Sequence, residues 1–340
     1  MDALLPRRMP AAAVSLPTRL ASFAMALMAL AAILAAPVAR ADDYPSRPIH
    51  IVVPYSAGGS SDAPMRVIAQ QMAQQMGEAI VIENKPGQGA MIGAEYVARA
   101  APDGYTLLLA SNPQAISATL YSHLSFDPVG DFAAISLFGR EPGVLVVNPS
   151  MPVRSVREFV DYVKARPDKI DYASSGNGSA QHLFTAMFLS AAGLRMMHIP
   201  YRGSAQAVTD VVAGQVLVAM PGLAAMMPHI REKRLIPLAV TGDQRSPLLP
   251  DVPTLAESGF PGFSAYVWSG LVAPKGTPPA IIERLNRELK KAMASDTVKA
   301  YMHNASVEIV TDTPAEFQAF FQQEKARDAK AIQDAGLKID

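Results

Sequence analysis

The chain has 340 residues, of which 50% are apolar and 18% are charged, and its 30 basic and 30 acidic side chains cancel to a formal charge of zero. This length is enough for a substantial core and for more than one lobe, and the absence of a basic excess argues against nucleic acid as a partner. Because the sequence has no cysteine, disulfides, thiolate metal sites and cysteine catalysis are excluded.

Residues 1–41 form a distinct leader that we interpret as a secretory signal peptide. They hold four arginines, one aspartate, the apolar run LASFAMALMALAAILAAP and the small-residue site Ala39-Arg40-Ala41. A membrane anchor is the competing interpretation, but the run is slightly shorter than the ~20 apolar residues of a spanning helix, and it ends in a cleavable pattern. We therefore expect cleavage after Ala41 and export, by the general or the twin-arginine route, of a soluble mature protein.

The first half of the mature chain predicts strands that alternate with helices. The segment 47–55 is rich in β-branched residues and almost continuously hydrophobic, which is typical of a buried parallel strand. Helical spacing follows over 63–76, and Gly77 is expected to end that helix. Residues 79–93 then predict a strand and a glycine-rich turn, and 103–111 predict the next strand.

The second half repeats this alternation. Ser155 and Glu158 form a capping box that opens one of its helices. Proline follows Thr277 and Thr313, at the first position of two C-terminal amphipathic helices. The remaining predicted units, two strand–loop–helix segments and a strand, lie at 169–183, 195–208 and 234–242.

Repeated strand–helix alternation predicts α/β lobes with parallel-dominated sheets covered by helices on both faces. Two proline-punctuated extended segments, 143–155 and 238–254, are the candidate connections between two lobes. Two connections make one lobe discontinuous in sequence. We predict a first lobe of 42–147 plus 241–340 and a second lobe of 148–240.

Two turns rich in glycine and serine, Ser56–Asp62 and Ser174–Ser179, are the candidate functional sites. In open α/β sheets, ligands bind where the carboxyl ends of strands meet helix N-termini, because free backbone N–H groups converge there. Neither turn has the lysine of a P-loop or the G-x-G-x-x-G pattern of a dinucleotide site, which argues against a nucleotide. The histidines have no metal-ligand spacing, so no metal is expected.

The second turn contains a serine and a nearby histidine, the residue types of nucleophilic catalysis, but not in a recognisable catalytic motif. His182 lies one turn after Ser179 and could act as its base, yet no G-x-S-x-G elbow occurs in the chain. His182 could equally bond a loop carbonyl or contact a ligand. An exported Ser/His hydrolase or isomerase of the α/β class is therefore the alternative function.

A small anion, most naturally a carboxylate, is the ligand that the two turns favour. Helix N-termini attract negative charge, and serine hydroxyls add further donors. Arg202 could supply an ion pair or be a solvated loop residue. Asp62 would repel a carboxylate, so we interpret it mainly as the N-cap of the 63–76 helix, with contact to an amino group as the alternative.

Five blocks of sequence resemble the solute receptors of tripartite tricarboxylate transporters, the Bug family. In order they are YPSRPIHIVVPYSAGGSSD, VIENKPGQGAMIGAEYVARAAPDGYTLLL, YASSGNGSAQHL, HIPYRGSAQAVTDVVAGQV and WSGLVAPKGTP. The resemblance implies a type II periplasmic binding protein whose two lobes, joined by two crossing strands, close on a small carboxylate. It also implies a non-catalytic monomer without cofactor or metal, which delivers its cargo to integral-membrane transporter subunits or reports it to a sensor kinase.

The resemblance also places the ligand on particular residues of this chain. The sequence departs from the family pattern at Tyr55 and Ser56, where phenylalanine and proline are common in the family. This departure leaves the identity of the carboxylate open. The residues expected to bind the ligand are Tyr55, Ser56, Ala57, Gly58, Gly59, Ser60, Ser61, Asp62, Ser111, Asn112, Ser174, Ser175, Gly176, Asn177, Gly178, Ser179, His182, Tyr201 and Arg202.

Overall fold

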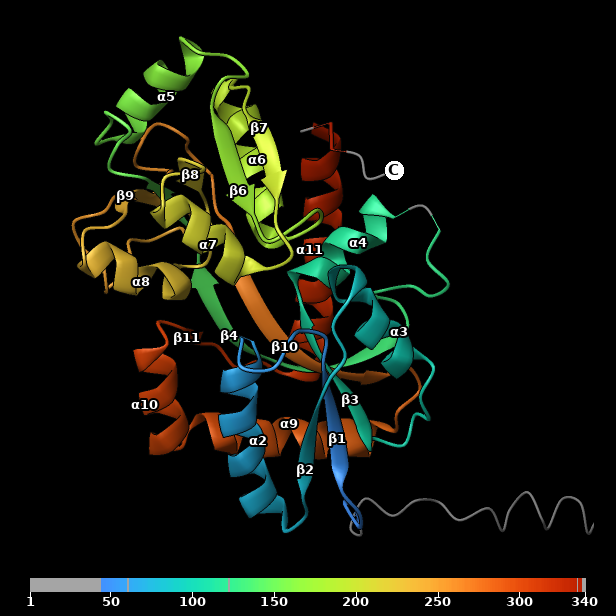
Figure 1. The fold of residues 1–340 in the computed structure, drawn as a ribbon. Helices are drawn as coiled ribbons and strands as arrows, with labels where there is room; N and C mark the ends of the chain where they lie inside the picture. The colour runs from blue at the N-terminus through green and yellow to red at the C-terminus, as the bar shows by residue number, and fades with distance from the viewer. Residues whose placement is uncertain (1–43, 60, 122, 335, 338–340) are drawn as a thin grey trace, which may run out of the picture. The chain divides into compact units, whose positions relative to one another are not determined.

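The computed structural model of the protein describes residues 44–59, 61–121, 123–334 and 336–337. The predicted signal peptide, with its cleavage site after Ala41, lies outside these residues. From Pro45 onward the chain forms one compact unit, which contains the two β-sheets of Figure 1.

The first sheet has six strands in the order β11-β4-β10-β3-β1-β2. Strand β1 is parallel to β2 and β3, whereas β10 is antiparallel to β3 and β4, and β11 is antiparallel to β4. The predicted buried strand is confirmed as β1, in which four of the five residues are buried. The strands are β1 (Ile49–Val53), β2 (Ile80–Asn84), β3 (Thr106–Ser111), β4 (Phe132–Pro142), β10 (Tyr266–Pro274) and β11 (Glu308–Ile309).

Two groups of helices pack against the first sheet. One group contains α2, α9 and α10, and the other contains α3, α4 and α11. Helix α2 ends at Gly77, whose φ of 74° is the left-handed conformation that favours glycine. The helices are α2 (Asp62–Met76), α3 (Met91–Ala98, after the short 3₁₀ turn Gln88–Ala90), α4 (Asn112–Leu120), α9 (Pro279–Met293), α10 (Asp296–Asn304) and α11 (Pro314–Asp334).

The second sheet has five strands in the order β7-β6-β8-β5-β9. Strand β6 is parallel to β7 and β8, and β5 is antiparallel to β8 and β9. One half of the predicted capping box of α5 is confirmed, because the Ser155 hydroxyl accepts the Glu158 N–H at 3.2 Å, whereas the Glu158 carboxylate accepts the N–H of Arg154 and not that of Ser155. The elements are β5 (Val144–Val147), α5 (Val156–Lys164), β6 (Asp171–Ser174), α6 (Ala180–Ala192), β7 (Met197–Pro200), α7 (Ser204–Val212), β8 (Val218–Ala219), α8 (Leu223–Arg231) and β9 (Ile236–Val240).

Two stretches of chain pass between the sheets, and Thr241 joins them. Strand β4 of the first sheet continues through Gly143 into β5 of the second. The Thr241 hydroxyl accepts the Gly143 N–H at 2.7 Å and donates to the carbonyl of Ala265, the residue before β10, at 2.6 Å. Both hydroxyl bonds are buried, so Thr241 fixes the two stretches to each other at the point of crossing.

The expected α/β fold with two mixed sheets and two crossings is confirmed, but the predicted boundaries differ from those of the sheets. We predicted that β5 belongs to the first lobe, whereas it hydrogen-bonds within the second sheet. The segment 241–265, which the prediction places in the first lobe, contributes Thr254 to a parallel bridge with Val240 of β9 in the second sheet. The run VLVV is hydrophobic enough for either sheet, so its sequence alone does not decide between them.

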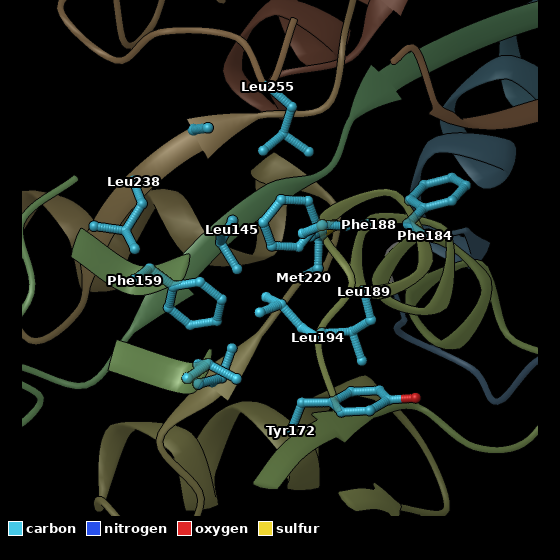
Figure 2. Close-up of a cluster of buried hydrophobic side chains, with 14 of the residues drawn as sticks. Leu145, Phe159, Tyr172, Phe184, Phe188, Leu189, Leu194, Met220, Leu238 and Leu255 are labelled. Carbon is cyan, nitrogen blue, oxygen red and sulfur yellow. The ribbon is translucent and has the colours of Figure 1, made fainter. Parts of the chain in front are cut away.

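The core of the second sheet extends into helices of the first. In Figure 2, Leu145 of β5, Phe159 of α5 and Phe188 of α6 lie together in this cluster. The same cluster includes Ile116 of α4 and Ile332 of α11. Each such side chain contributes roughly 1.5–3 kcal/mol when fully buried, so apolar packing as well as the crossing strands holds the two sheets together.

Candidate ligand-binding site

Both glycine- and serine-rich turns follow the carboxyl ends of parallel strands. The first loop (residues 55–61) connects β1 to α2, and the second loop (residues 174–179) lies between β6 and α6. In Figure 1 these ends of the two sheets are turned toward each other, on the side where the neighbouring strands β4 and β10 meet the second sheet. Two helix N-termini, each with backbone N–H groups that lack a helical partner, therefore occur at the same region of the molecule.

Asp62 organises the first loop from inside the protein. Its carboxylate is fully buried and accepts the Gly58 N–H at 2.8 Å, the Asn84 side-chain amide at 2.8 Å and the Arg66 Nε at 2.8 Å. Burial alone would raise its pKa, but the bonds from Arg66, Gly58 and Asn84 outweigh it and hold the pKa of Asp62 below its usual value. The carboxylate is thus ionised and saturated with donors.

This arrangement corrects our interpretation of Asp62 as an N-cap. Asp62 is the first residue of α2, Ser61 occupies the N-cap position, and the Asp62 side chain bonds an N–H outside the helix. A contact between Asp62 and a ligand amino group has no support either, because Arg66 and Asn84 already occupy both carboxylate oxygens.

The outer part of the first loop is exposed. Ser56, Ala57, Gly58 and Gly59 are all exposed, and Gly58 has a φ of +77°. The N–H groups of Ala57 and Ser61 donate to no other described residue. The loop therefore has main-chain donors that no other described residue accepts, and their contact with a ligand stays a prediction. Ser60, which we also expect to bind, lies outside the described residues.

Tyr55, the first residue of this loop, contacts Ser111 at the end of β3, and Asn112 follows at the start of α4. The Tyr55 hydroxyl is 2.5 Å from Ser111 Oγ, and burial raises the pKa of Tyr55 to about 12. The buried Asn112 side chain donates to the Tyr266 carbonyl at 3.0 Å and accepts the Trp268 N–H at 3.1 Å. Since both amide atoms of Asn112 are occupied, its role here is to hold α4 against β10.

The second loop is folded by its own side chains. The fully buried Ser174 hydroxyl lies 2.6 Å from His198 Nε2 and 3.1 Å from the Gly176 carbonyl. The Ser179 hydroxyl accepts the backbone N–H of His182 at 3.2 Å, as an N-cap does. The side chain of Ser175, and the N–H of Asn177, bond no other described residue, so both are free to meet a ligand.

His182 supports the second loop with its ring. Its Nδ1 accepts the Gly178 N–H at 3.3 Å, and its ring stacks on His198 with centroids 4.0 Å apart and planes inclined by 9°. Burial lowers the pKa of both histidines to about 4, and in His198 the neighbouring His182 lowers it further. Both rings are therefore neutral near pH 7.

These bonds are not those of a nucleophile and its base. Ser179 bonds the backbone of His182 and not its ring. Ser174 does contact a histidine ring, but its hydroxyl is buried within the loop and is also bonded to Gly176. No arrangement in this loop exposes an activated hydroxyl to a substrate.

The loop after β7 lies directly against the second loop. The Gln181 side chain accepts the Ser175 N–H at 3.0 Å and donates to Ser204 Oγ at 3.0 Å, which ties α6 to the start of α7. Tyr201 donates its hydroxyl to Asp210 at 2.8 Å and so points along α7. Arg202 is exposed and forms no ion pair with any other described residue, which leaves its charge available.

Sequence reasoning missed the residues that support the loops. Asn84 of β2 bonds Tyr55 of the first loop, and His198 of β7 bonds Ser174 of the second. Gln181, in the first turn of α6, bonds Ser175 of the second loop. The tetrapeptide GSAQ, which occurs at 178–181 and 203–206, was a usable signal, because Gln181 of the first copy bonds Ser204 of the second.

Two cavities lie near the sheets. A small one of about 50 Å³ is lined by Ser61 of the first loop together with Glu141 of β4 and Ser269 of β10. A larger one of about 570 Å³ lies between α6, the segment 259–264 and the C-terminal part of α11, and contains no predicted ligand-binding residue. Across the described residues, every helix is too short or too polar to span a bilayer.

Comparison with known proteins identifies the family. Residues 65–337 match the family model described as "Tripartite tricarboxylate transporter family receptor". The chain belongs to this family. BugT of Bordetella pertussis is 37% identical over 309 residues, which cover 90% of this chain and 94% of BugT.

Solved structures agree with this assignment. The periplasmic binding protein BugD is similar with a TM-score of 0.79 and 35% identity, covering 87% of this chain and 99% of BugD. A protein of R. palustris with adipate has a TM-score of 0.81 and 33% identity, with 87% and 99% of the two chains covered. MatC from Rhodopseudomonas palustris with bound malate has a TM-score of 0.78 and 29% identity, with 85% and 100% covered.

The family resemblance predicted from the sequence is thereby confirmed. The family and these structural neighbours are solute-binding proteins and not enzymes, which leaves the hydrolase alternative without support. The type II periplasmic binding protein fold is confirmed as well, since the neighbours cover almost the whole described chain.

Proposed function

We propose that this protein is a periplasmic receptor that holds a small carboxylate between two lobes, one built around each sheet. The observation that carries the proposal is the pair of loops that follow β1 and β6, each at the start of a helix, with residues 56–59 exposed in the first loop and Asn177 exposed in the second. A carboxylate there accepts N–H bonds from Ala57 and Ser61 on one side and from Asn177 on the other.

The chemistry of both loops suits an anion. Serine hydroxyls at 175 and 179 add donors, and helix N-termini contribute about 0.3–1 kcal/mol each toward a negative charge, more when partly buried. Asp62 does not oppose this, because Arg66 and Asn84 neutralise and saturate its carboxylate. Arg202 supplies a full positive charge at the edge of the second loop, and charge-assisted bonds are about twice as strong as neutral ones.

The ligands of the relatives support a dicarboxylate. One structural neighbour has adipate and another has malate bound, and both compounds carry two carboxylates. Two loops that each present helix-start donors match a ligand with an anionic group at each end. Bridging water suits such a site, since it adapts main-chain donors to ligands of different length at small cost.

Binding would favour a closed arrangement of the two lobes. A ligand that contacts both loops shifts the population toward the closed form by the difference in its affinity for the two forms. Closure would rotate the lobes about the crossing strands, where Thr241 joins Gly143 to Ala265. The closed receptor would then deliver its cargo to integral-membrane transporter subunits, or report it to a sensor kinase, after export by the predicted signal peptide.

Native mass spectrometry of the purified mature protein tests this proposal, followed by calorimetric titration with adipate and malate. We expect one ligand per chain, retained or added, and no conversion of the ligand. The double variant Ser175→Ala/Ser179→Ala should weaken binding by about tenfold or more, which corresponds to roughly 1.4 kcal/mol.

Ser155→Ala is the matched control for the double variant. Ser155 and Ser179 are both N-caps that accept a backbone N–H at 3.2 Å, so both changes remove a cap worth about 1 kcal/mol. Only the change in the second loop should weaken binding. Equal affinity of the double variant and the wild type would remove the second loop from the site, and release of a chemical product would contradict a receptor.

A further inference from the structure

Glu141 connects the crossing strand to a helix of the second sheet. It lies on β4, two residues before Gly143. Its Oε2 accepts the backbone N–H of Ala224 at 2.7 Å, in the first turn of α8. A side chain from the first sheet thus caps the N-terminus of a helix that packs on the second sheet.

Gly222 makes room for this contact. It is the N-cap residue of α8 and has no side chain to cap the helix itself. A Cβ added at Gly222 would lie 2.4 Å from Glu141 Oε1, so the carboxylate occupies the space of the missing side chain. The Val144 N–H donates to the Pro221 carbonyl at 2.8 Å, which holds the backbone before α8 beside β5.

The helix N-terminus is the partner that Glu141 has in the described structure. No lysine or arginine of the described residues forms an ion pair with it. Burial raises the pKa of Glu141 to about 7, against the effect of the Ala224 N–H. A half-buried acid without a cation is costly, and the positive end of α8 offsets part of that cost.

Glu141 also lies next to the candidate ligand site. It lines the small cavity that Ser61 of the first loop lines as well. One side chain therefore adjoins the first loop and bonds a helix of the second sheet, at the place where the chain crosses between the sheets.

We propose that Glu141 is a positioning residue for ligand binding, whose carboxylate holds α8 against the crossing strand and so fixes the angle between the two lobes. The inference rests on the proposed function only in that ligand binding is taken to favour the closed form. Without this contact the lobes would adopt a broader range of angles, and less of the population would be ready to close.

Distances between spin labels, measured by pulsed electron resonance, test this proposal in the mature protein. The chain has no cysteine, so labels can be attached at Gln74→Cys in α2 and Arg157→Cys in α5, both of which are exposed. We expect Glu141→Ala to broaden or shift the distance distribution without ligand, and Glu141→Gln, which keeps an acceptor oxygen, to retain most of the wild-type distribution.

Gly222→Ala provides a second route to the same change. Its φ is ordinary for any residue, −58°, and the atom that it displaces is the end of a flexible side chain, so this variant should fold even if Glu141→Ala does not. We expect the two variants to give the same distribution, and the double variant to add no further change. Glu308→Ala, which removes the partner of the adjacent Arg140, is the control and should leave the distribution unchanged.

The outcomes separate this inference from the proposed function. A wild-type distribution in both Glu141→Ala and Gly222→Ala without ligand would overturn the positioning role, whatever the protein binds. A changed distribution together with no binding of adipate or malate by the wild type would support the role of Glu141 while leaving the ligand class of the receptor in question. If adipate or malate binds, we expect its affinity to fall at least threefold in both variants.

Discussion

His182 stacks face to face on His198, with ring centroids 4.0 Å apart, directly beneath the second loop. Tyr172 continues the stack, with its ring 4.9 Å from that of His198. The loop depends on His182 in the neutral form, since its Nδ1 accepts the Gly178 N–H, while His198 contacts the Ser174 hydroxyl through Nε2. A proton on His182 Nδ1 would point at the Gly178 N–H and remove that bond.

The stack predicts a loss of stability and of ligand affinity in acid. The pKa of each histidine is about 4 in the folded protein, against an ordinary value of 6.5. Between these values the unfolded chain binds more protons to these histidines than the folded one, so the contribution of the two histidines to stability falls as the pH drops from 6.5 toward 4 and is constant above 6.5. Thermal unfolding and titration with adipate across this range would measure both effects.

His198→Phe keeps a ring in the stack and removes one titrating group. We expect its melting temperature to fall less than that of the wild type between pH 6.5 and pH 4. The carboxyls Glu141, Glu324 and Asp328 act in the opposite direction, because burial raises their pKa values to about 7, about 7 and about 6, but they are common to both proteins and cancel in the comparison. Parallel pH curves for the two proteins would contradict a role for the stack.

Asp62→Asn should damage the first loop. The amide would present N–H groups to at least one of the donors Gly58, Arg66 and Asn84, all of which now bond the carboxylate. We expect a loss of about 1–3 kcal/mol in the free energy of unfolding and a clear fall in ligand affinity. Asp103→Asn, which breaks only the exposed pair with Arg47, should change stability by less than about 1 kcal/mol and leave affinity intact.

Gly58→Ala, in the first loop before α2, and Gly77→Ala, at the C-cap of α2, form a matched pair. Gly58 has φ +77° and Gly77 has φ +74°, and an added Cβ at either position would meet no atom within 4 Å. Both alanines should cost about 1–2 kcal/mol of stability through backbone strain alone. Only Gly58→Ala should also weaken ligand binding, as titration would detect, because only Gly58 lies in the first loop. Equal affinities in the two variants would argue against that loop.

The local pattern of the sequence was enough to predict the elements and the loops. Hydrophobic periodicity located β1 and α2, and the cap at Ser155 located α5, because these signals depend on neighbouring residues only. The glycine and serine content of the loops also marked them correctly as helix starts. The resemblance then supplied the family, which no single loop could have given.

The supporting contacts could not be predicted, because they join distant parts of the chain. Asp62 depends on Asn84 of β2, and Ser174 depends on His198 of β7. Asn112 has an ordinary polar side chain in sequence, yet its bonds to β10 make it part of the scaffold. The place of β5 in the second sheet could not be predicted for the same reason, since its partner strands β8 and β9 follow much later in the chain.

Arg202→Gln should slow association of the ligand. Arg202 is exposed and unpaired among the described residues, so its charge acts on an approaching anion mainly through the solvent. We expect the association rate to fall by about 2- to 10-fold at low salt and by less at high salt, where exposed charges are screened. Lys164→Gln on α5 removes the same charge from an exposed site on another element and should change the rate much less; equal effects would contradict a specific role for Arg202.

A crystal structure of the mature protein with the carboxylate that it retains, or with adipate, would test the shared site most directly. We expect the ligand to accept hydrogen bonds, directly or through one water, from backbone N–H groups of both the first loop and the second loop. A ligand held by one loop alone, or seated in the cavity beside α11, would contradict this account.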